Sequence, residues 1–353
     1  MGTRANDKRL QELRDKGYQI YSISRLNTLH QCNYQAYLNY ILGEKQKPNI
    51  WACAGGIIHD RLEDCIHHRG TKEDLRKAID DELENFQMLD IDFPLDKNGN
   101  PTVRNNWIKN MTRFAEEFEI PHGNFETEQL VILPIHKNAV MQGYIDVIEH
   151  NDDGSVNIWD WKTSSQFTGS HLIEAGRQLA FYAMALENEG LRVNKVQWVM
   201  LKYYEMTWIQ KNGKPKVKVG EWRNFTEDNL NVFEKKLLEL GIDEVDVDMI
   251  LDKAKKTNKL PDELKDFFTV KPYVREYELT DDIKNETMMY IQDTIHNYEE
   301  LAETHRKWEP CNCKDNSYFC ANLCGYGGKS GKCQYWTEYC ETFEKKSDDD
   351  DLF

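Results

Sequence analysis

The apolar residues of the chain recur with two periods, one typical of helices and one typical of strands. Residues 22–42 read SISRLNTLHQCNYQAYLNYIL, which predicts a helix because apolar and aromatic side chains follow a serine cap at helical spacing. Further helices are predicted from about Gly55 (IIHDRLEDCIHH) and over 171–188, 226–255 and 280–306. Strands are predicted over 127–135, 140–150, 156–163 and 195–204. The pair Asn212–Gly213 predicts a hairpin turn after the last strand.

Strands and helices follow one another along the chain, which indicates an α/β fold. Residues 70–125 interrupt this order with charged helical pieces and the loop FPLDKNGNP, and we interpret them as an insertion. We therefore expect an N-terminal segment over 1–21 and one main domain over 22–306. A cysteine-rich segment (307–343) and an acidic, disordered tail (344–353) are expected to follow.

Size and composition are those of a folded globular protein. The chain has 353 residues, of which 40% are hydrophobic and 11% aromatic, and these values allow a sizeable core. We find no signal peptide and no apolar run long enough to span a membrane, so we expect a soluble, cytoplasmic protein. The net charge of −16 argues against a generally DNA-binding surface. A nucleic-acid enzyme of this charge would need a local basic groove or metal ions at its site.

Residues 143–162 (GYIDVIEHNDDGSVNIWDWK) place charged side chains inside two apolar strands. Side chains alternate along a strand, so Asp160 and Lys162 are expected on one face. A three-residue loop over 152–154 places glycine at its last position, where a left-handed conformation is favoured. That loop sets a register in which Asp146 lies opposite Asp160.

Two carboxylates side by side destabilise a sheet unless a cation lies between them. Carboxylate oxygens are the ligands that Mg²⁺ or Mn²⁺ prefers. A neighbouring lysine can orient or help deprotonate an attacking water and stabilise the charge that develops on a phosphate. The alternative is a surface hairpin whose acids and lysine face solvent. Apolar neighbours favour central strands instead, and these are Ile145, Val147, Ile158, Trp159 and Trp161.

Two other patterns accompany the acidic hairpin. His59 ends a G-x-x-x-H pattern on a predicted helix, and Gln178 and Tyr182 share one face of another helix at i and i+4. Taken singly, the histidine is an ordinary packed or surface residue and the Gln/Tyr pair an ordinary helix edge. Their order and spacing around G-x-I-D and D-x-K are what indicate a site.

This series of motifs resembles the PD-(D/E)XK nuclease superfamily. Within it, the sequence is most similar to the RecB-type nuclease domain, which is shared with the AddB helicase–nuclease subunit and the iron–sulfur CRISPR-adaptation exonucleases. The resemblance extends from about Ser22 to Cys340, apart from residues 70–125. It implies a restriction-endonuclease-like core, in which helices flank a mixed central sheet, with a helical insertion and a cysteine-rich closing segment.

The resemblance also implies roles for single residues. His59, Asp146 and Asp160 would bind Mg²⁺ or Mn²⁺ together with the carbonyl of Trp161. Lys162 would be the catalytic lysine. Gln178 and Tyr182 would steady the site and the DNA strand, and Glu128 matches a weakly defined acid of the family. Asp160 stands where many relatives carry glutamate, and either acid can bind a metal.

Nine cysteines are many for a chain without a secretion signal, and the odd total argues for a metal site over disulfides. Six of them crowd one C-terminal stretch, namely Cys311, Cys313, Cys320, Cys324, Cys333 and Cys340.

The resemblance implies a cluster held by one cysteine of the first helix and three near the C-terminus. The candidates are Cys32, Cys324, Cys333 and Cys340, with Cys320 as a rival. The family's usual C-x2-C is missing, because Ser330 stands where its first cysteine is expected. The family favours [4Fe–4S], while Zn²⁺ is the alternative, since spacing alone does not decide. The remaining cysteines leave room for a separate zinc site.

The C-terminal residues DDDDLF are either a solubilising tail or a peptide that binds a replication or recombination partner. They resemble the acidic tips of single-stranded DNA-binding proteins and, more distantly, sliding-clamp peptides. In both cases Phe353 would be the anchor and the aspartates would steer binding.

We therefore expect a metal-dependent DNA exonuclease that acts on single strands or duplex ends in recombination, repair or replication, in a bacterium or a phage. One alternative is a catalytically silent DNA-binding or scaffold subunit, which the intact acidic and lysine set disfavours. A restriction-like endonuclease is the third reading, although no specificity domain is recognisable.

Overall fold

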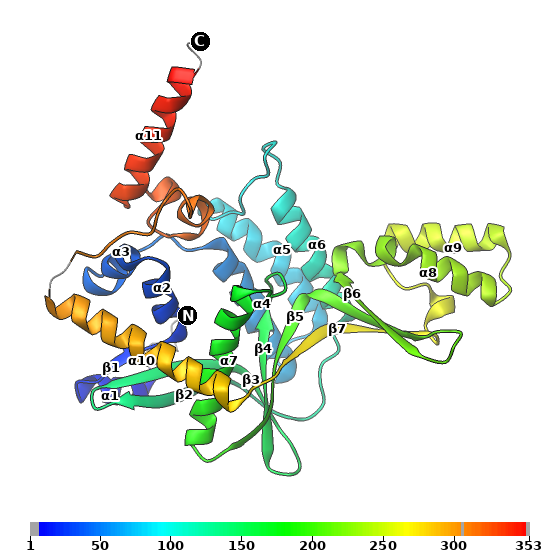
Figure 1. Ribbon diagram of the computed structural model, residues 1–353. Coiled ribbons are helices and arrows are strands. Elements are labelled where there is room, and N and C mark those ends of the chain that lie inside the picture. Colours follow the sequence, from blue (N-terminus) through cyan, green and yellow to red (C-terminus); the bar gives the residue numbers. More distant parts are fainter. Residues whose placement is uncertain (1–6, 305–306, 351–353) are drawn as a thin grey trace.

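A computed structural model describes residues 7–304 and 307–350, and its centre is a mixed sheet of seven strands (Figure 1). The strands are β1 (Gln19–Tyr21), β2 (Asn124–His136), β3 (Ala139–His150), β4 (Ser155–Lys162), β5 (Arg192–Ile209), β6 (Pro215–Glu221) and β7 (Phe268–Tyr277). Their order is β1-β3-β4-β5-β6, with β2 also pairing with β3 and β7 with β5. Two pairs, β1·β3 and β4·β5, are parallel, and the other pairs are antiparallel.

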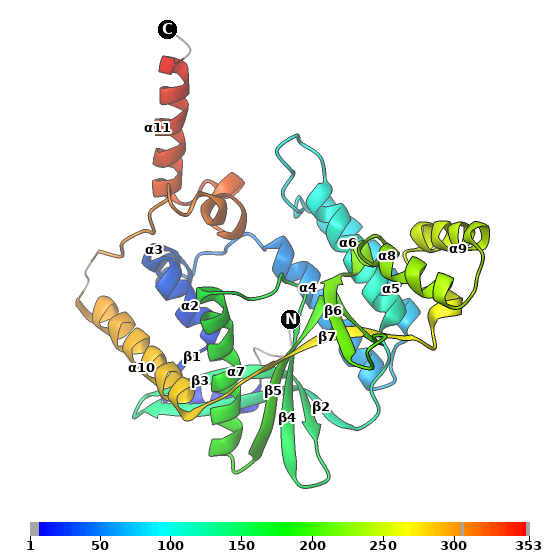
Figure 2. The same cartoon turned by 45° about the vertical axis from the view of Figure 1, so that its right-hand side comes forward.

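Helices cover both faces of the sheet, as Figures 1 and 2 show. One face packs against α4 (Ile50–Ile66), α5 (Lys72–Met88) and α6 (Thr102–Glu117). The other packs against α2 (Ile23–Gln31), α7 (Ser170–Asn188) and α10 (Asp281–Thr304). Each face has its own apolar core, with Trp161 of β4 in the first and Ile158 in the second. The mixed sheet between two helical layers confirms the predicted fold class.

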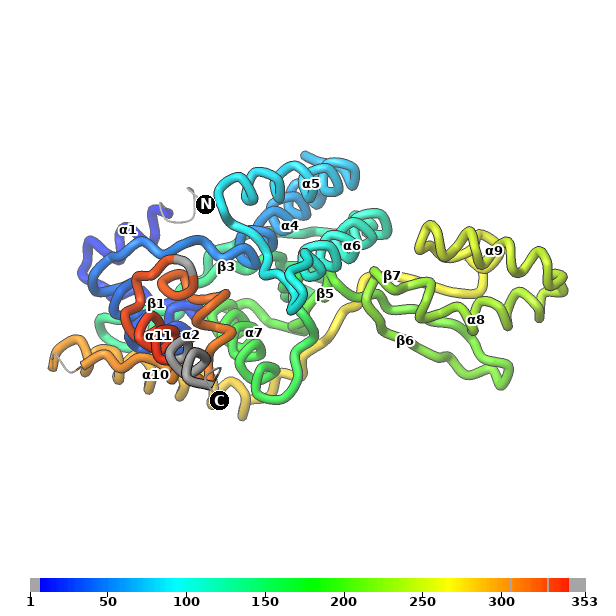
Figure 3. The backbone as a smooth tube through the Cα atoms, turned by 90° about the horizontal axis from the view of Figure 1, so that it is seen from above, coloured from blue at the N-terminus to red at the C-terminus, as the bar shows by residue number. Residues whose placement is uncertain are grey.

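The far ends of β5, β6 and β7 extend beyond the helical layers. Together with α8 (Phe225–Glu239) and α9 (Glu244–Thr257) they form an arm, which is clearest when the molecule is seen from above (Figure 3). Buried aromatic side chains at its base continue the core under α4–α6, and these include Trp222, Phe225 and Phe233.

The helix predicted for residues 22–42 is interrupted at Cys32. The backbone of Cys32 is extended (φ −161°, ψ 106°), and Cys32 Sγ accepts a hydrogen bond from Gln35 N in α3 (Asn33–Ala36). A π-helical turn, η2 (Tyr37–Ile41), follows. The next helix begins at Ile50 and not near Gly55, because the side chain of Asn49 caps it by accepting a hydrogen bond from Trp51 N (2.8 Å).

Residues 70–125, interpreted as an insertion, consist mainly of α5 and α6. Leu75 and Ile79 of α5 and Met111 and Phe114 of α6 are fully buried in the core that also contains α4. These helices therefore support α4, the helix that carries His59. The single helix predicted for 226–255 is two helices, α8 and α9. Elements that were not predicted include α1 (Lys8–Asp15), β1 and β7.

The C-terminal helix α11 (Gln334–Asp350) extends away from the body of the molecule (Figure 1). It includes residues 344–350, for which a disordered tail was expected. Leu352 and Phe353 lie outside the described residues, so the partner-peptide reading of DDDDLF stays a prediction. Among the described helices, none combines the length and apolar character needed to cross a membrane.

Candidate active site

The acidic hairpin has the predicted register. Four residue pairs from Val147–Trp159 to His150–Val156 follow one alignment, and Asn151 N donates a hydrogen bond to Ser155 O (2.9 Å) across the loop. Gly154 has φ +77°, the left-handed conformation expected at the end of a three-residue loop. The ladder ends at Val147 and Trp159, and continued by one step this alignment would bring Asp146 opposite Asp160.

The backbone is irregular at Asp146. Ile145 packs in the core under α7, whereas Val147 packs in the core under α4, although alternation would place both on one face. The residue that faces Asp146 in the β2–β3 register is Glu128, a non-glycine residue with φ +52°. Such strained conformations collect at functional sites. The strand changes face at Asp146, and this places the buried carboxylate of Asp146 at the end of the hairpin.

Asp146 is held by groups from two elements. Its Oδ2 accepts a hydrogen bond from Trp161 N (2.8 Å), and its Oδ1 lies 3.4 Å from Nδ1 of His59 on α4. The imidazole of His59 also packs edge-on against the Trp161 ring, with 5.6 Å between the ring centroids. The histidine predicted from G-x-x-x-H thus meets the predicted aspartate.

Lys162 is positioned by a chain of polar contacts. Its Nζ lies 2.6 Å from Asp160 Oδ2 and donates a hydrogen bond to Gln178 Oε1 (3.0 Å). Gln178 Nε2 donates to the Tyr182 hydroxyl (2.9 Å), which donates to the carbonyl of Tyr144 on β3 (2.7 Å). Burial raises the pKa of Tyr182 well above its ordinary value, so this hydroxyl keeps its proton and remains a donor. The predicted pair on α7 therefore orients the predicted lysine.

Gly143 explains the first letter of the G-x-I-D motif. A Cβ on Gly143 would lie 2.7 Å from Cε1 of Tyr182 and 2.8 Å from Cε1 of Phe181. Only a residue without a side chain lets α7 approach β3 this closely, which Tyr182 needs to reach the carbonyl of Tyr144.

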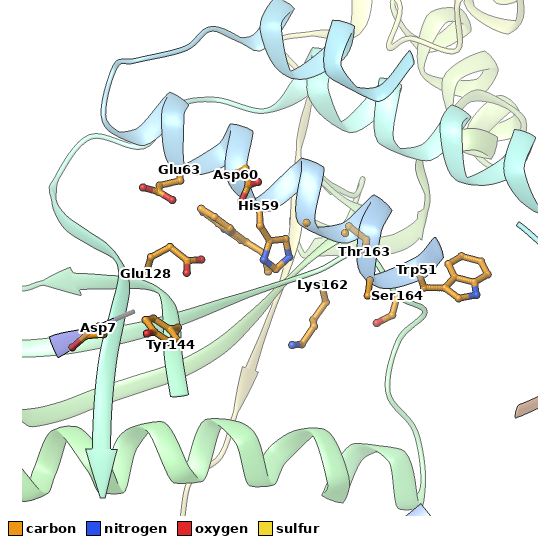
Figure 4. A pocket seen from close by; sticks show the side chains of 14 residues that line it. Asp7, Trp51, His59, Asp60, Glu63, Glu128, Tyr144, Lys162, Thr163 and Ser164 are labelled. Carbon is orange, nitrogen blue, oxygen red and sulfur yellow. The ribbon is translucent and has the colours of Figure 1, made fainter. Parts of the chain in front are cut away.

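A cavity of about 630 Å³ lies along α4, and of the groups above His59, Trp161, Lys162, Tyr144 and Glu128 line it (Figure 4). Asp146 and Asp160 contact His59 and Lys162 but are not part of this lining. His59 and Lys162 are at its centre, and Glu128 lies toward one end. Several other lining residues were not predicted, namely Asp7, Trp51, Ala52, Gly55, Gly56, Asp60, Glu63, Tyr144, Thr163 and Ser164. For those on α4 a signal exists, because they recur every three or four residues on the face that carries His59.

A model of the PD-(D/E)XK nuclease superfamily matches residues 20–308, most of the chain. The chain belongs to the PD-(D/E)XK nuclease superfamily. Among solved structures, a protein from Eubacterium rectale described as "Putative exonuclease" matches with a TM-score of 0.41 and 10% identity, over 90% of this chain and 92% of that one. The protein SSO0001 matches with a TM-score of 0.32 and 12% identity, over 90% and 86%. A search of curated proteins gives no match.

In this PD-(D/E)XK nuclease the two aspartates differ in their electrostatics. Burial raises the pKa of Asp160 to about 6, and repulsion from Asp146 adds to this, against the attraction of Lys162. Burial also acts on Asp146, but His59 and Lys162 outweigh it and lower the pKa of that carboxyl. For Lys162 and for His59, burial disfavours the charged form, and the aspartates reverse the effect and raise both pKa values.

PD-(D/E)XK nucleases usually use divalent metals, and the donors of this site have suitable chemistry. Within the described residues, no three His, Cys, Asp or Glu side chains are grouped closely enough to hold an ion. Asp160 Oδ2 is buried, and its contact with Lys162 Nζ at 2.6 Å leaves it further capacity as an acceptor. Two buried carboxylates and an imidazole fit Mg²⁺ or Mn²⁺, so the residues present are compatible with such an ion.

A second, small cavity lies against the cysteine-rich segment of the nuclease. It is lined by six cysteines, namely Cys32, Cys311, Cys313, Cys320, Cys324 and Cys333. Cys311 N donates a hydrogen bond to Cys32 Sγ (3.3 Å), and the sulfurs of Cys311 and Cys320 are 3.6 Å apart. Burial raises the pKa of Cys311 to about 12.

The two ends of the domain therefore meet, as the cluster prediction requires. Three predicted ligands, Cys32, Cys324 and Cys333, and the rival Cys320 line the cavity, whereas Cys340 on α11 is absent from its lining. Cys311, for which a separate site was considered, lies in the same cavity. Within the described residues these sulfurs do not form a group close enough to hold a metal, so the cluster stays a prediction.

Proposed function

We propose that the protein is a divalent-metal-dependent DNA exonuclease of the RecB type, which hydrolyses phosphodiester bonds on single strands or at duplex ends. The observation that carries this proposal is the meeting of Asp146, Asp160, Lys162 and His59, of which His59 and Lys162 line one cavity. Gathering four ionisable groups is costly when two of them, Asp146 and Asp160, are buried, and such arrangements are typical of catalytic sites.

In this proposal Asp146, Asp160 and His59 hold the metal ion, with the Trp161 carbonyl as a further ligand. The bound ion supplies charge neutralisation at the phosphate and makes water a better nucleophile at neutral pH. Glu128, at one end of the same cavity, is a further acid that can contact bound water.

Lys162 acts as a cation and not as a general base. Its pKa is raised because Asp160 and Asp146 outweigh its burial, so the ammonium group stays protonated at neutral pH. Gln178 and Tyr182 fix its direction. An ammonium group held in place stabilises the negative charge that develops on the phosphate as water attacks.

Activity is tested on three DNA substrates with Mn²⁺ or Mg²⁺, namely end-labelled single strands, end-labelled duplexes and single-stranded circles. The catalytic variant is Lys162→Ala. The matched control is Lys195→Ala, since Lys195 is an exposed lysine of β5 paired with Glu276. We expect wild type and the control to degrade linear substrates from their ends, and Lys162→Ala to leave them intact.

Three other outcomes contradict parts of the proposal. If wild type leaves every substrate intact with all metals, the catalytic proposal is wrong and a silent scaffold is favoured. If circles are cut as fast as linear strands, the protein is an endonuclease. If Lys162→Ala retains full activity, the site lies elsewhere.

We also propose that the six-cysteine cavity holds a metal cluster, [4Fe–4S] in preference to Zn²⁺. Support comes from the convergence of Cys32 with cysteines almost 300 positions later in the chain. Protein purified without oxygen is expected to contain iron and acid-labile sulfide, and Cys32→Ala to lose them. Zinc without sulfide would identify the alternative, and the absence of both would refute the cluster.

A further inference from the structure

The first turns of α4 form one end of the catalytic cavity. Trp51, Ala52, Gly55 and Gly56 line this end, one to two turns before His59 (Figure 4). Their spacing of three and four residues makes them a continuous stripe on the helix surface. The stripe therefore leads directly to the centre of the site.

The two glycines of this stripe have no structural explanation within the protein. Glycine is among the least favourable residues in the interior of a helix. A Cβ at Gly56 would meet no atom within 4 Å, and one at Gly55 would make only an ordinary contact, 3.5 Å from Thr163 Oγ1. Neither residue has a positive φ. An unfavourable residue that packing does not require indicates space kept for another molecule.

Trp51 supplies an aromatic surface at the end of the stripe. Its side chain is half-buried, and its ring packs edge-on against Phe93, with 4.8 Å between the centroids and 79° between the planes. The cap formed by Asn49 fixes its backbone. A partly exposed indole held in this way is suited to stacking on a nucleobase.

The charged residues that line the cavity also favour the binding of a polyanion at the Trp51 end. Asp60 and Glu63 lie beyond His59 on α4, and Asp7 and Glu128 lie near them (Figure 4). Arg69 pairs with Glu63 (2.9 Å) and Arg9 with Asp7 (3.3 Å), while Asp60 is exposed. At the Trp51 end, none of the described residues that line the cavity is acidic, and Thr163 and Ser164 provide hydroxyl groups there. Phosphates are repelled less at this end.

We propose that Trp51, Gly55 and Gly56 form a subsite for one nucleotide of a single DNA strand, next to the scissile phosphate. The base stacks on Trp51, and the sugar–phosphate backbone lies against the glycine surface of α4. This inference rests on the proposed function and specifies it, because a base can stack on Trp51 only when it is unpaired. The subsite therefore selects single strands and frayed duplex ends.

The first test is Gly56→Ala. The added methyl group meets no protein atom, so the variant is expected to be more thermostable than wild type. It is also expected to raise KM for single-stranded DNA about ten-fold with little change in kcat, because the methyl group occupies the space of the backbone. A more stable variant with unchanged KM would overturn the glycine part of the subsite.

The second test uses a set of single-stranded oligonucleotides, each with one abasic position near the labelled end. Wild type is expected to show KM about ten-fold higher at one particular position, where the missing base would have stacked. Trp51→Ala is expected to have the higher KM on every oligonucleotide, wherever the abasic position lies. Trp51→Phe is expected to restore most of the wild-type affinity and its dependence on position. A merely structural role of Trp51 would not remove this position dependence.

The outcomes distinguish this inference from the proposed function. If wild type degrades DNA but shows no position dependence, or if Trp51→Ala keeps it, the subsite is refuted and the nuclease proposal stands. If wild type neither binds nor degrades DNA, the nuclease proposal fails and the subsite fails with it.

Discussion

Replacement of Asp160 by asparagine tests the electrostatics of the site through protein stability. Asp160 is 2% exposed, and its pKa of about 6 means that the folded protein disfavours its charged form. Burial is the main cause, repulsion from Asp146 adds to it, and Lys162 opposes both. Asparagine has nearly the same shape and no charge, so Asp160→Asn should make the metal-free protein more stable at neutral pH.

The size of the effect follows from the shift. The pKa rises from 3.8 to about 6 on folding, or about 2.2 units, and each unit corresponds to about 1.36 kcal/mol. Asp160→Asn should therefore gain about 3 kcal/mol in the free energy of unfolding at neutral pH. Because the folded pKa is the higher one, wild type loses this stability as pH rises from about 4 through about 6. The advantage of the variant should fall below about 1 kcal/mol near pH 4.

The assay is urea unfolding in the presence of a chelator, since a bound metal would stabilise wild type. The matched variant is Asp146→Asn. Its effect should have the opposite sign, because His59 and Lys162 lower the pKa of Asp146 and its charged form is favoured on folding. The reasoning is refuted if Asp160→Asn is less stable than wild type near neutral pH, or if its gain is the same near pH 4.

Four further predictions concern the surroundings of these aspartates. Tyr182→Phe removes the donor to the Tyr144 carbonyl and should lower kcat about ten-fold with little change in KM; unchanged kcat would show that Lys162 needs no such support. Gly143→Ala should lower the free energy of unfolding by about 1–3 kcal/mol because its methyl group overlaps Tyr182, whereas Gly56→Ala should raise it by about 1 kcal/mol. The Mn²⁺ concentration needed for half-maximal activity should rise as the pH falls from about 8 to about 6, since the raised pKa of His59 lets protons compete with the metal. If this concentration does not change with pH, His59 is not a metal ligand. In Cys32→Ala, amide hydrogen exchange should accelerate over residues 44–51, because these residues hydrogen-bond to residues 323–326 of the cysteine-rich segment. Unchanged protection would show that the cysteines do not order the start of α4.

The register of the catalytic hairpin was predictable because it is local. The loop 152–154 ends in glycine, and that one residue sets the alignment of Asp146 with Asp160. Gln178 and Tyr182 were predictable for a similar reason, since helical spacing places them on one face. The family model confirms the superfamily that these motifs resembled, and the mixed sheet confirms the fold class.

What could not be predicted depends on contacts between distant parts of the chain. β1 has three residues and exists only through its pairing with β3, more than a hundred positions later. β7 contains Pro272 and many charges, and the proline stands where its pairing with β5 shifts register. The break at Cys32 is stabilised in part by its contact with Cys311 N. The positive φ of Glu128, opposite Asp146, could not be predicted from the sequence, because glutamate is not a residue that favours positive φ.

Helix α4 connects these observations, because it carries His59 of the proposed metal site and Gly56 and Trp51 of the proposed subsite. The residues that lead into α4 contact the cysteine-rich segment. Asn49, which caps α4, also donates a hydrogen bond from Nδ2 to Leu323 O (3.1 Å). Lys47 N donates to Gly325 O (3.0 Å), and Tyr326 donates from its hydroxyl to Glu44 O (2.6 Å).

The close approach of these two segments requires a glycine. A Cβ at Gly325 would lie 2.8 Å from the carbonyl oxygen of Lys47, so no larger residue fits there without moving the backbone. A helix terminus gains its orientation from such capping and backbone contacts, and residues 44–49 have few others of this kind in the described chain. A cluster that orders the cysteine-rich segment would therefore fix the start of α4 and, through it, the distance between Trp51 and the catalytic centre. Under this proposal the cysteines would affect activity without any contact with the reacting phosphate.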